Sequence, residues 1–155
     1  MADPYAPLHA SAFAYQGVGC LLLGPSGSGK SWLVGEAIAL GARLIADDRV
    51  ILMPMMGLVS ASPAPELAGV LELRGLGLVR LNDVAAKHLV HLVVELDPAY
   101  DMRLPELEKR PFLDVPIPYL RAAPVPKTSA SALLIYMKAM QENRVLPTDW
   151  RPKAV

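Results

Sequence analysis

The stretch Gly24-Pro25-Ser26-Gly27-Ser28-Gly29-Lys30-Ser31 decides the fold, because it has the residue types and the spacing of a P-loop. In a P-loop a buried strand feeds a glycine-rich loop and a helix begins where the loop ends, so that backbone N–H groups surround a phosphate. The flanks agree with this pattern, since residues 18–23 are typical of a buried strand and residues 30–40 of a helix that ends before Gly41. A chance match in a loop rich in glycine and serine would lack these flanks. The sequence therefore predicts a nucleotide-binding α/β domain.

Size and composition favour a single globular domain. The chain has 155 residues, of which 53% are apolar and 19% charged, and Lys plus Arg equals Asp plus Glu at 15 each. Because the charges balance, the sequence gives no sign of a basic surface that would bind nucleic acid. No apolar run approaches the roughly 20 residues of a membrane span. The N-terminus lacks the charge and the apolar stretch of a signal peptide. We expect a cytoplasmic protein with one domain over residues 1–143, a tail over 144–155, and Cys20 in the core.

Further elements are predicted from apolar runs and turn residues. Strands are expected at residues 12–15, 43–46, 50–53, 58–61, 70–73, 78–81 and 89–96. Pro54 is expected to stop the strand before it, and Asn82-Asp83 to cap a short helix through Lys87. Residues 97–128 carry many prolines and are expected to be loop with one or two edge strands. A last helix is expected over 130–142, capped by Thr128 or Ser129, with its apolar side formed by Ala132, Leu133, Ile135, Tyr136, Met137 and Met140.

The P-loop predicts a metal site and an acidic partner. Lys30 is expected to reach the β- and γ-phosphates, and the Ser31 hydroxyl to ligate Mg²⁺. A second, acidic contact to the metal is then needed, and Asp47-Asp48 follows an apolar strand about a dozen residues after Ser31. Adjacent carboxylates on an extended segment face opposite sides, so both enter one site only where the strand twists or ends. One would hold the metal and the other would accept a proton from an attacking hydroxyl; the alternative is a solvated acidic turn.

Two more titratable residues are candidates for the site. His9 is expected either to exchange a proton with a nearby aspartate or to lie on the surface without a role. Glu72 precedes Arg74-Gly75-Leu76-Gly77, where glycines allow the backbone to approach a ligand, or else it faces outward from its strand. His88 and His91 flank an apolar strand without cysteines or carboxylates at metal spacing, and we interpret both as structural.

Four segments together resemble the catalytic domain of the HPr kinase/phosphorylase family over roughly residues 5–96. They are His9-Ala10-Ser11, Gly24 to Ser31, Leu44 to Asp48 and Leu71 to Gly77. The resemblance is to a short form that consists of the C-terminal catalytic domain. It implies a P-loop α/β domain of the phosphoenolpyruvate carboxykinase-like type, with a mixed sheet and flanking helices, and assembly into a homo-oligomer, a hexamer.

The resemblance also implies an activity. Members of this family use ATP and Mg²⁺ to phosphorylate a serine of HPr, the phosphocarrier protein of the sugar phosphotransferase system, and can remove that phosphate with inorganic phosphate to give pyrophosphate. Carried over by position, Asp48 would be the base for the serine hydroxyl, with Asp47 and His9 beside it and His9 setting the protonation of the aspartate pair. Ser31, Asp47 and Glu72 would serve Mg²⁺. The nucleotide would be held by Gly24, Pro25, Ser26, Gly27, Ser28, Gly29, Lys30 and Ser31.

The sequence departs from the family at two places. Trp32 follows the P-loop serine where the family commonly has an acidic residue, and Pro124 to Ser129 replaces an Arg-Pro-Gly-Arg-Asn element, with Lys127 as its only cation. A lysine cannot reproduce the fork geometry of arginine, so we expect the kinase reaction to be retained more readily than phosphorolysis. Two alternatives stay open: a small-molecule kinase on the same scaffold, and a nucleotide-responsive regulatory protein with little catalysis.

Overall fold

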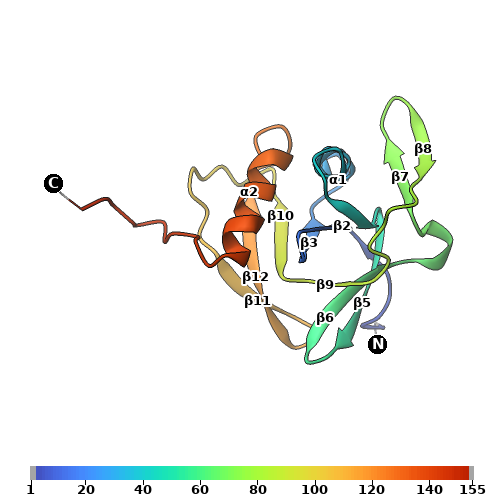
Figure 1. The fold of residues 1–155 in the computed structure, drawn as a ribbon, viewed down its shortest axis with the longest axis horizontal. Coiled ribbons are helices and arrows are strands. Elements are labelled where there is room, and N and C mark those ends of the chain that lie inside the picture. The colour runs from blue at the N-terminus through green and yellow to red at the C-terminus, as the bar shows by residue number, and fades with distance from the viewer. Residues whose placement is uncertain (1–2, 154–155) are drawn as a thin grey trace.

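A six-stranded mixed sheet forms the centre of the fold, seen in a computed structural model that describes residues 3–153 (Figure 1). Its order is β11-β12-β10-β3-β2-β4, in which β3, β10 and β12 run parallel and their other neighbours antiparallel. The strands are β2 (Ser11–Tyr15), β3 (Val18–Leu23), β4 (Arg43–Ala46), β10 (Leu92–Leu96), β11 (Glu108–Phe112) and β12 (Val115–Ala122). The predicted α/β class with a mixed sheet is confirmed.

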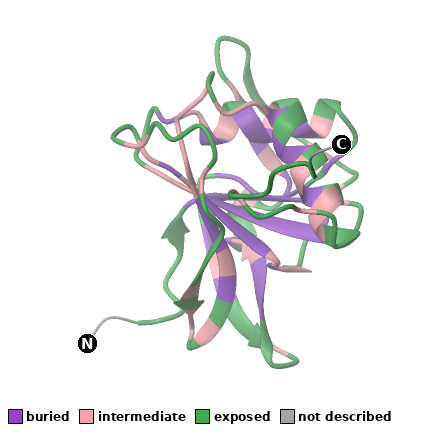
Figure 2. Cartoon of the chain, turned by 90° about the vertical axis from the view of Figure 1, so that its left-hand side faces the viewer, coloured by how far each residue is buried: buried purple, intermediate pink, exposed green. Residues whose placement is uncertain are grey.

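Two helices and a smaller sheet cover the two faces of this sheet. The helices are α1 (Lys30–Ala39) and α2 (Ala130–Gln141), and their core with the sheet includes Phe13, Cys20, Leu22, Leu33 and Met137. On the other face lies a four-stranded sheet of β1 (Leu8–His9), β5 (Arg49–Met55), β6 (Leu58–Pro63) and β9 (His88–Leu89), with a core that includes Leu21, Ile45, Val50 and Val59. Because both faces are covered, the central strands are nearly all apolar, and burial concentrates there (Figure 2).

Two neighbouring segments cross from one sheet to the other. β1 continues through Ala10 into β2, and β4 continues through Asp47-Asp48 into β5; His9 pairs with Arg49, and the Ala10 N–H donates to the Asp48 carbonyl at 3.2 Å. Asp48 takes a left-handed backbone with φ 71°, a conformation that aspartate tolerates better than most residues. Because the backbone turns at Asp48, the adjacent carboxylates of Asp47 and Asp48 need not point to opposite faces, as they would in a continuous strand.

The remaining elements form a projecting hairpin of β7 (Val70–Leu73) and β8 (Gly77–Arg80), preceded by a 3₁₀ turn over Pro65–Leu67. No helix within residues 3–153 is long and apolar enough to cross a membrane. After α2, residues 142–153 contain neither helix nor strand. The division of the chain at residue 143 stays a prediction.

Two predictions about proline were wrong. Pro54 lies inside β5 and pairs with Val59 of β6. A proline fits there because β1 pairs only with the beginning of β5, so within residues 3–153 no strand pairs with Pro54 on its other side. Of the two strands within residues 97–128, β11 is an edge strand as predicted, but β12, over residues 115–122, is an inner strand. Pro116 and Pro118 fit there because pairing of β12 with β10 begins at Tyr119, after both prolines.

Three other predictions need correction. Residues 82–87 form no helix; Val84 instead makes a bridge with Leu44, and Arg43 Nε donates to Asp83 at 3.0 Å. The strand predicted at 89–96 is interrupted between β9 and β10. The two helices have the predicted positions, but some of their apolar side chains face solvent: Leu40 and Ile135 are 53% and 72% exposed, Ala132 is exposed, and Leu134 is buried in place of Ile135.

Candidate active site

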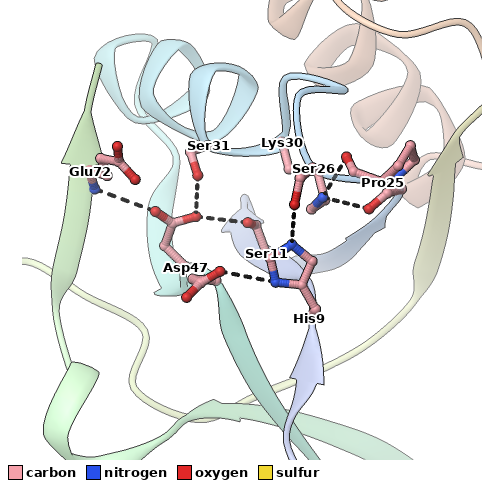
Figure 3. A network of polar contacts seen from close by, with 10 residues as sticks. His9, Ser11, Pro25, Ser26, Lys30, Ser31, Asp47 and Glu72 are labelled. Carbon is pink, nitrogen blue, oxygen red and sulfur yellow. Dashed lines mark hydrogen bonds and ion pairs between the residues drawn. The ribbon is translucent and has the colours of Figure 1, made fainter. Parts of the chain in front are cut away.

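Asp47 forms a buried corner of the site beneath the start of α1 (Figure 3). Its Oδ1 accepts hydrogen bonds from the Ser11 hydroxyl at 2.7 Å and the Ser31 hydroxyl at 2.8 Å, and its Oδ2 from the Glu72 N–H at 3.4 Å. Asp47 is 5% exposed, and three donors from β2, α1 and β7 fix its carboxylate. We call Asp47, Ser11 and Ser31 the buried corner.

Asp48 forms an open corner on the same turn. Its Oδ1 lies 3.0 Å from His9 Nδ1, and the side chains of His9 and Asp48 are 55% and 58% exposed. The other imidazole nitrogen, Nε2, lies 3.3 Å from the Ser26 hydroxyl of the P-loop (Figure 3). We call Asp48, His9 and Ser26 the open corner. A carboxylate held by an imidazole and open to solvent can take a proton from a hydroxyl that approaches from outside.

The P-loop has the predicted strand–loop–helix context, between β3 and α1. The Lys30 ammonium donates to the carbonyls of Gly24 at 2.5 Å and Pro25 at 3.1 Å. Burial lowers the pKa of Lys30, and the nearby carboxylates of Asp47 and Asp48 act against this shift. Lys30 lines the cavity beside the loop, where a P-loop lysine meets an anionic ligand.

Two glycines of the loop are required by close packing. A Cβ on Gly24 would lie 2.7 Å from the Leu96 carbonyl oxygen at the end of β10, and one on Gly29 would lie 2.6 Å from the Val125 Cβ. Gly27 has open space around it. Ser28, within the loop, is buried, and its hydroxyl has no hydrogen-bond partner among residues 3–153.

The side-chain oxygens of the buried corner are suitable ligands for Mg²⁺. Within residues 3–153 no three or more His, Cys, Asp or Glu side chains gather as a metal site. Mg²⁺ is typically held by one or two carboxylates together with water and substrate phosphates, and Asp47 and Ser31 supply a carboxylate and a hydroxyl of this kind. Glu72 is exposed, contributes its backbone N–H to Asp47, and lines the adjoining cavity.

One cavity of about 650 Å³ connects these groups. Of the predicted residues, it is lined by His9, Ser26, Gly27, Gly29, Lys30, Ser31, Asp48 and Glu72; Asp47 lies directly behind Ser31. Sequence reasoning missed Ser11 and Arg74, which also line it, and treated Trp32 only as a departure. The available signal for Ser11 was its place in the His9-Ala10-Ser11 segment, one of the four that carry the family resemblance. The cavity leaves out Lys127, which instead pairs with Asp101 at 3.1 Å.

His88 and His91 lie away from this cavity. His91 Nδ1 accepts a hydrogen bond from the Gly19 N–H at 3.0 Å, and the two imidazole rings meet edge to face. Burial, and secondly His88, lower the pKa of His91. These contacts agree with the structural interpretation of both histidines.

Comparison with known proteins shows the family to which this chain belongs. A family model described as the HPr serine kinase C-terminal domain matches residues 3–146. The chain belongs to this family. The HPr serine kinase domain thus accounts for nearly all of the described elements, including the P-loop, both aspartates and the β7–β8 hairpin.

Curated relatives of this HPr serine kinase family domain are named HPr kinase/phosphorylase. That of Latilactobacillus sakei is 32% identical over 145 residues, covering 86% of this chain and 46% of the relative. That of Caldanaerobacter subterraneus is 31% identical over 153 residues, covering 91% of this chain and 50% of the relative. The chain therefore spans about half the length of these relatives.

A solved structure shares the fold. The structure titled as the Hpr(Ser) kinase/phosphatase from Coxiella burnetii superimposes with a TM-score of 0.78 at 21% identity, covering 88% of this chain and 97% of the other. At this identity the likeness establishes the α/β fold alone.

Proposed function

We propose that this chain transfers the γ-phosphoryl group of ATP to a serine hydroxyl of HPr in a Mg²⁺-dependent reaction. The observation that carries the proposal is the pair of corners on one turn, one buried against the P-loop serine and one open to solvent. Membership of the HPr serine kinase family supports HPr as the acceptor. Asp47 and Ser31 would hold Mg²⁺, which neutralises phosphate charge and orients the phosphates when bound.

The residues of the chain have separate roles in this proposal. Lys30 and the P-loop N–H groups bind the phosphates and stabilise their negative charge. The Asp48 carboxylate accepts the proton of the serine hydroxyl as the serine oxygen bonds to the γ-phosphorus and the bond to the ADP oxygen breaks. His9 holds that carboxylate in place through its Nδ1, and it joins Asp48 to the P-loop through Ser26.

A second candidate function follows from Lys127. The Lys127 ammonium pairs with Asp101 and does not line the cavity, so the loop before α2 supplies only Val125 to the site. A chain that binds nucleotide but transfers phosphate slowly could act as a nucleotide-responsive regulator. Phosphorolysis, which needs inorganic phosphate bound beside the phosphoserine, would suffer most from a missing cation.

The experiment is a transfer assay with Mg-ATP, HPr, and an HPr variant in which the acceptor serine is replaced by alanine. We expect phosphoserine on HPr and none on the alanine variant. No phosphoserine at stoichiometric enzyme, with nucleotide bound, would reject the kinase and favour the regulator. Turnover of a metabolite but not of HPr would favour a small-molecule kinase. Incubation of phosphoserine-HPr with inorganic phosphate measures the reverse reaction. Assembly into a hexamer stays a prediction of the family resemblance.

A further inference from the structure

The cavity continues beyond the phosphate-binding loop as a groove between α1 and the β7–β8 hairpin. Along α1 it is lined at i, i+3, i+4 and i+7 spacing, which places the four residues on one helix face: Trp32, Gly35, Glu36 and Ala39. The facing wall consists of Leu73, Arg74 and Leu76. A Cβ on Gly35 would lie 3.8 Å from Leu73 Cδ2, an ordinary van der Waals contact, so the two walls lie close together at this point. We call this extension the α1–hairpin groove.

The free N–H groups of α1 end beside this groove. The first helical hydrogen bond runs from the Leu33 N–H to the Gly29 carbonyl at 2.9 Å, so the N–H groups of Lys30, Ser31 and Trp32 have no acceptor within the helix. Such N–H groups bind phosphate oxygens at the helix N-terminus. In a P-loop the lysine reaches the β- and γ-phosphates, while the backbone also cradles the α-phosphate. The nucleoside attached to the α-phosphate is therefore expected beside Trp32, the last of the three residues with a free N–H group.

The Trp32 side chain is suited to stacking. It is 56% exposed, and its single N–H already donates to the Glu36 carboxylate. An indole has no second polar group, so what Trp32 can offer a ligand is its apolar ring. Leu73 and Leu76 lie on the facing wall of the groove, and Leu76 is 87% exposed, so this wall offers apolar surface to a ligand.

The acceptor has a different entrance. Its hydroxyl must reach Asp48, which lies with His9 on the segments that cross between the sheets, and both are open to solvent there. The groove instead follows α1 to Ala39, eight residues past Ser31 and so about 12 Å along the helix axis. Nucleoside and acceptor can thus occupy separate arms of one cavity.

We propose that Trp32 binds the nucleoside of the nucleotide, by stacking of the base on its indole in the α1–hairpin groove. The proposal rests on nucleotide binding by the P-loop, as argued above, and adds a residue that makes affinity depend on the base as well as the phosphates.

The test compares ATP with inorganic tripolyphosphate, which has the phosphates and no nucleoside. Calorimetry with Mg²⁺ would measure both ligands on the unaltered chain, Trp32→Ala and Trp32→Phe. Since loss of an aromatic stacking partner typically weakens binding by roughly tenfold or more, Trp32→Ala should weaken ATP binding by about that factor. It should leave tripolyphosphate affinity within about twofold, and Trp32→Phe should retain most of the ATP affinity because a ring remains.

Fluorescence gives a second readout. The chain has two tryptophans, and Trp150 does not line the cavity, so Trp150→Phe leaves Trp32 as the only tryptophan, which can be excited selectively, without altering the site. ATP should change its emission well beyond any change caused by tripolyphosphate.

Equal losses of ATP and tripolyphosphate affinity in Trp32→Ala, or no loss of either, would overturn this inference and leave nucleotide binding intact. An unchanged ATP affinity with a raised KM for HPr would also overturn it, because the groove would then belong to the acceptor. Failure of the unaltered chain to bind either ligand would reject the P-loop function itself, and the role of Trp32 with it.

Discussion

The buried and open corners of the site differ in almost every physical property although adjacent residues supply their carboxylates. Asp47 is 5% exposed and accepts hydrogen bonds from two hydroxyls, whereas the Asp48 side chain is 58% exposed and has an imidazole as its partner. A buried carboxylate with fixed donors keeps one position, as a metal ligand must. An exposed one can meet an incoming group. The left-handed residue at the turn allows this division of roles.

The largest effect is expected at the open corner. Asp48→Asn should lower kcat roughly 10²–10⁴-fold, the usual contribution of a general base, because an amide cannot accept the serine proton. Asparagine also tolerates the left-handed backbone, so the melting temperature and ATP affinity should stay close to those of the unaltered chain. Transfer assays together with thermal melts measure both. Full activity in this variant would contradict the assignment of the base.

The buried corner should respond through stability. Asp47→Ala removes the acceptor of the buried Ser11 hydroxyl and of the Ser31 hydroxyl, which should lower the free energy of unfolding by about 1–3 kcal/mol. Denaturant titration measures this change, with Asp48→Asn as the matched control. The Mg²⁺ dependence of ATP binding should also weaken. If Asp48→Asn destabilised the chain more than Asp47→Ala, the contrast between the corners would be wrong.

A smaller effect is expected at His9. Both members of the His9–Asp48 pair are more than half exposed, and such pairs contribute up to about 1 kcal/mol, so His9→Ala should lower kcat about fivefold. Because an imidazole exchanges protons near neutral pH, the pH dependence of transfer should change as well. His9→Gln, which keeps a hydrogen-bonding group without that exchange, separates the two effects. An unchanged pH profile would return His9 to the status of a surface residue.

The smallest effect concerns His91, a histidine outside both corners. Its pKa in the folded chain lies below the ordinary 6.5, so the unfolded chain binds more protons once the pH falls below about 6.5. Stability should therefore decline with falling pH in that range. His91→Asn offers an oxygen to the Gly19 N–H and should flatten the decline. Melting temperatures at pH 5 to 7.5 would show this, with transfer at pH 7.5 unaffected; an equal slope in both chains would refute it.

The sequence was sufficient wherever one local pattern determined the structure. The strand, loop and helix around Lys30 were predicted nearly to the residue, as was the cap of α2, where the Ser129 hydroxyl accepts the Ala132 N–H at 3.2 Å. It was insufficient where the structure depended on neighbours. Whether Pro54 and Pro118 can lie in strands depends on which partner strand is present at those positions, and the local sequence does not contain that information.

The candidate site shows the same limit. The P-loop and the aspartate pair could be identified from spacing, and the need for a twist at the pair was foreseen. The left-handed turn at Asp48, the hydrogen bond from Ser11 and the groove beside Trp32 arise from segments that meet only in the folded chain.

The tight packing of the P-loop against Leu96 and Val125 has a consequence for how related chains are interpreted. Substitution of Gly24 or Gly29 would push the P-loop away from the end of β10 or from Val125 in the loop before α2, whether or not the chain transfers phosphate. Descendants that had lost catalysis would still be selected to keep these two glycines for folding. Gly27 has free space around it and Asp48 is exposed, but both take left-handed backbones, with φ 84° and 71°, that most other residues adopt only with strain. Because asparagine tolerates this backbone and lacks the carboxylate, an asparagine at position 48 is the earlier sign of a lineage that has abandoned the reaction.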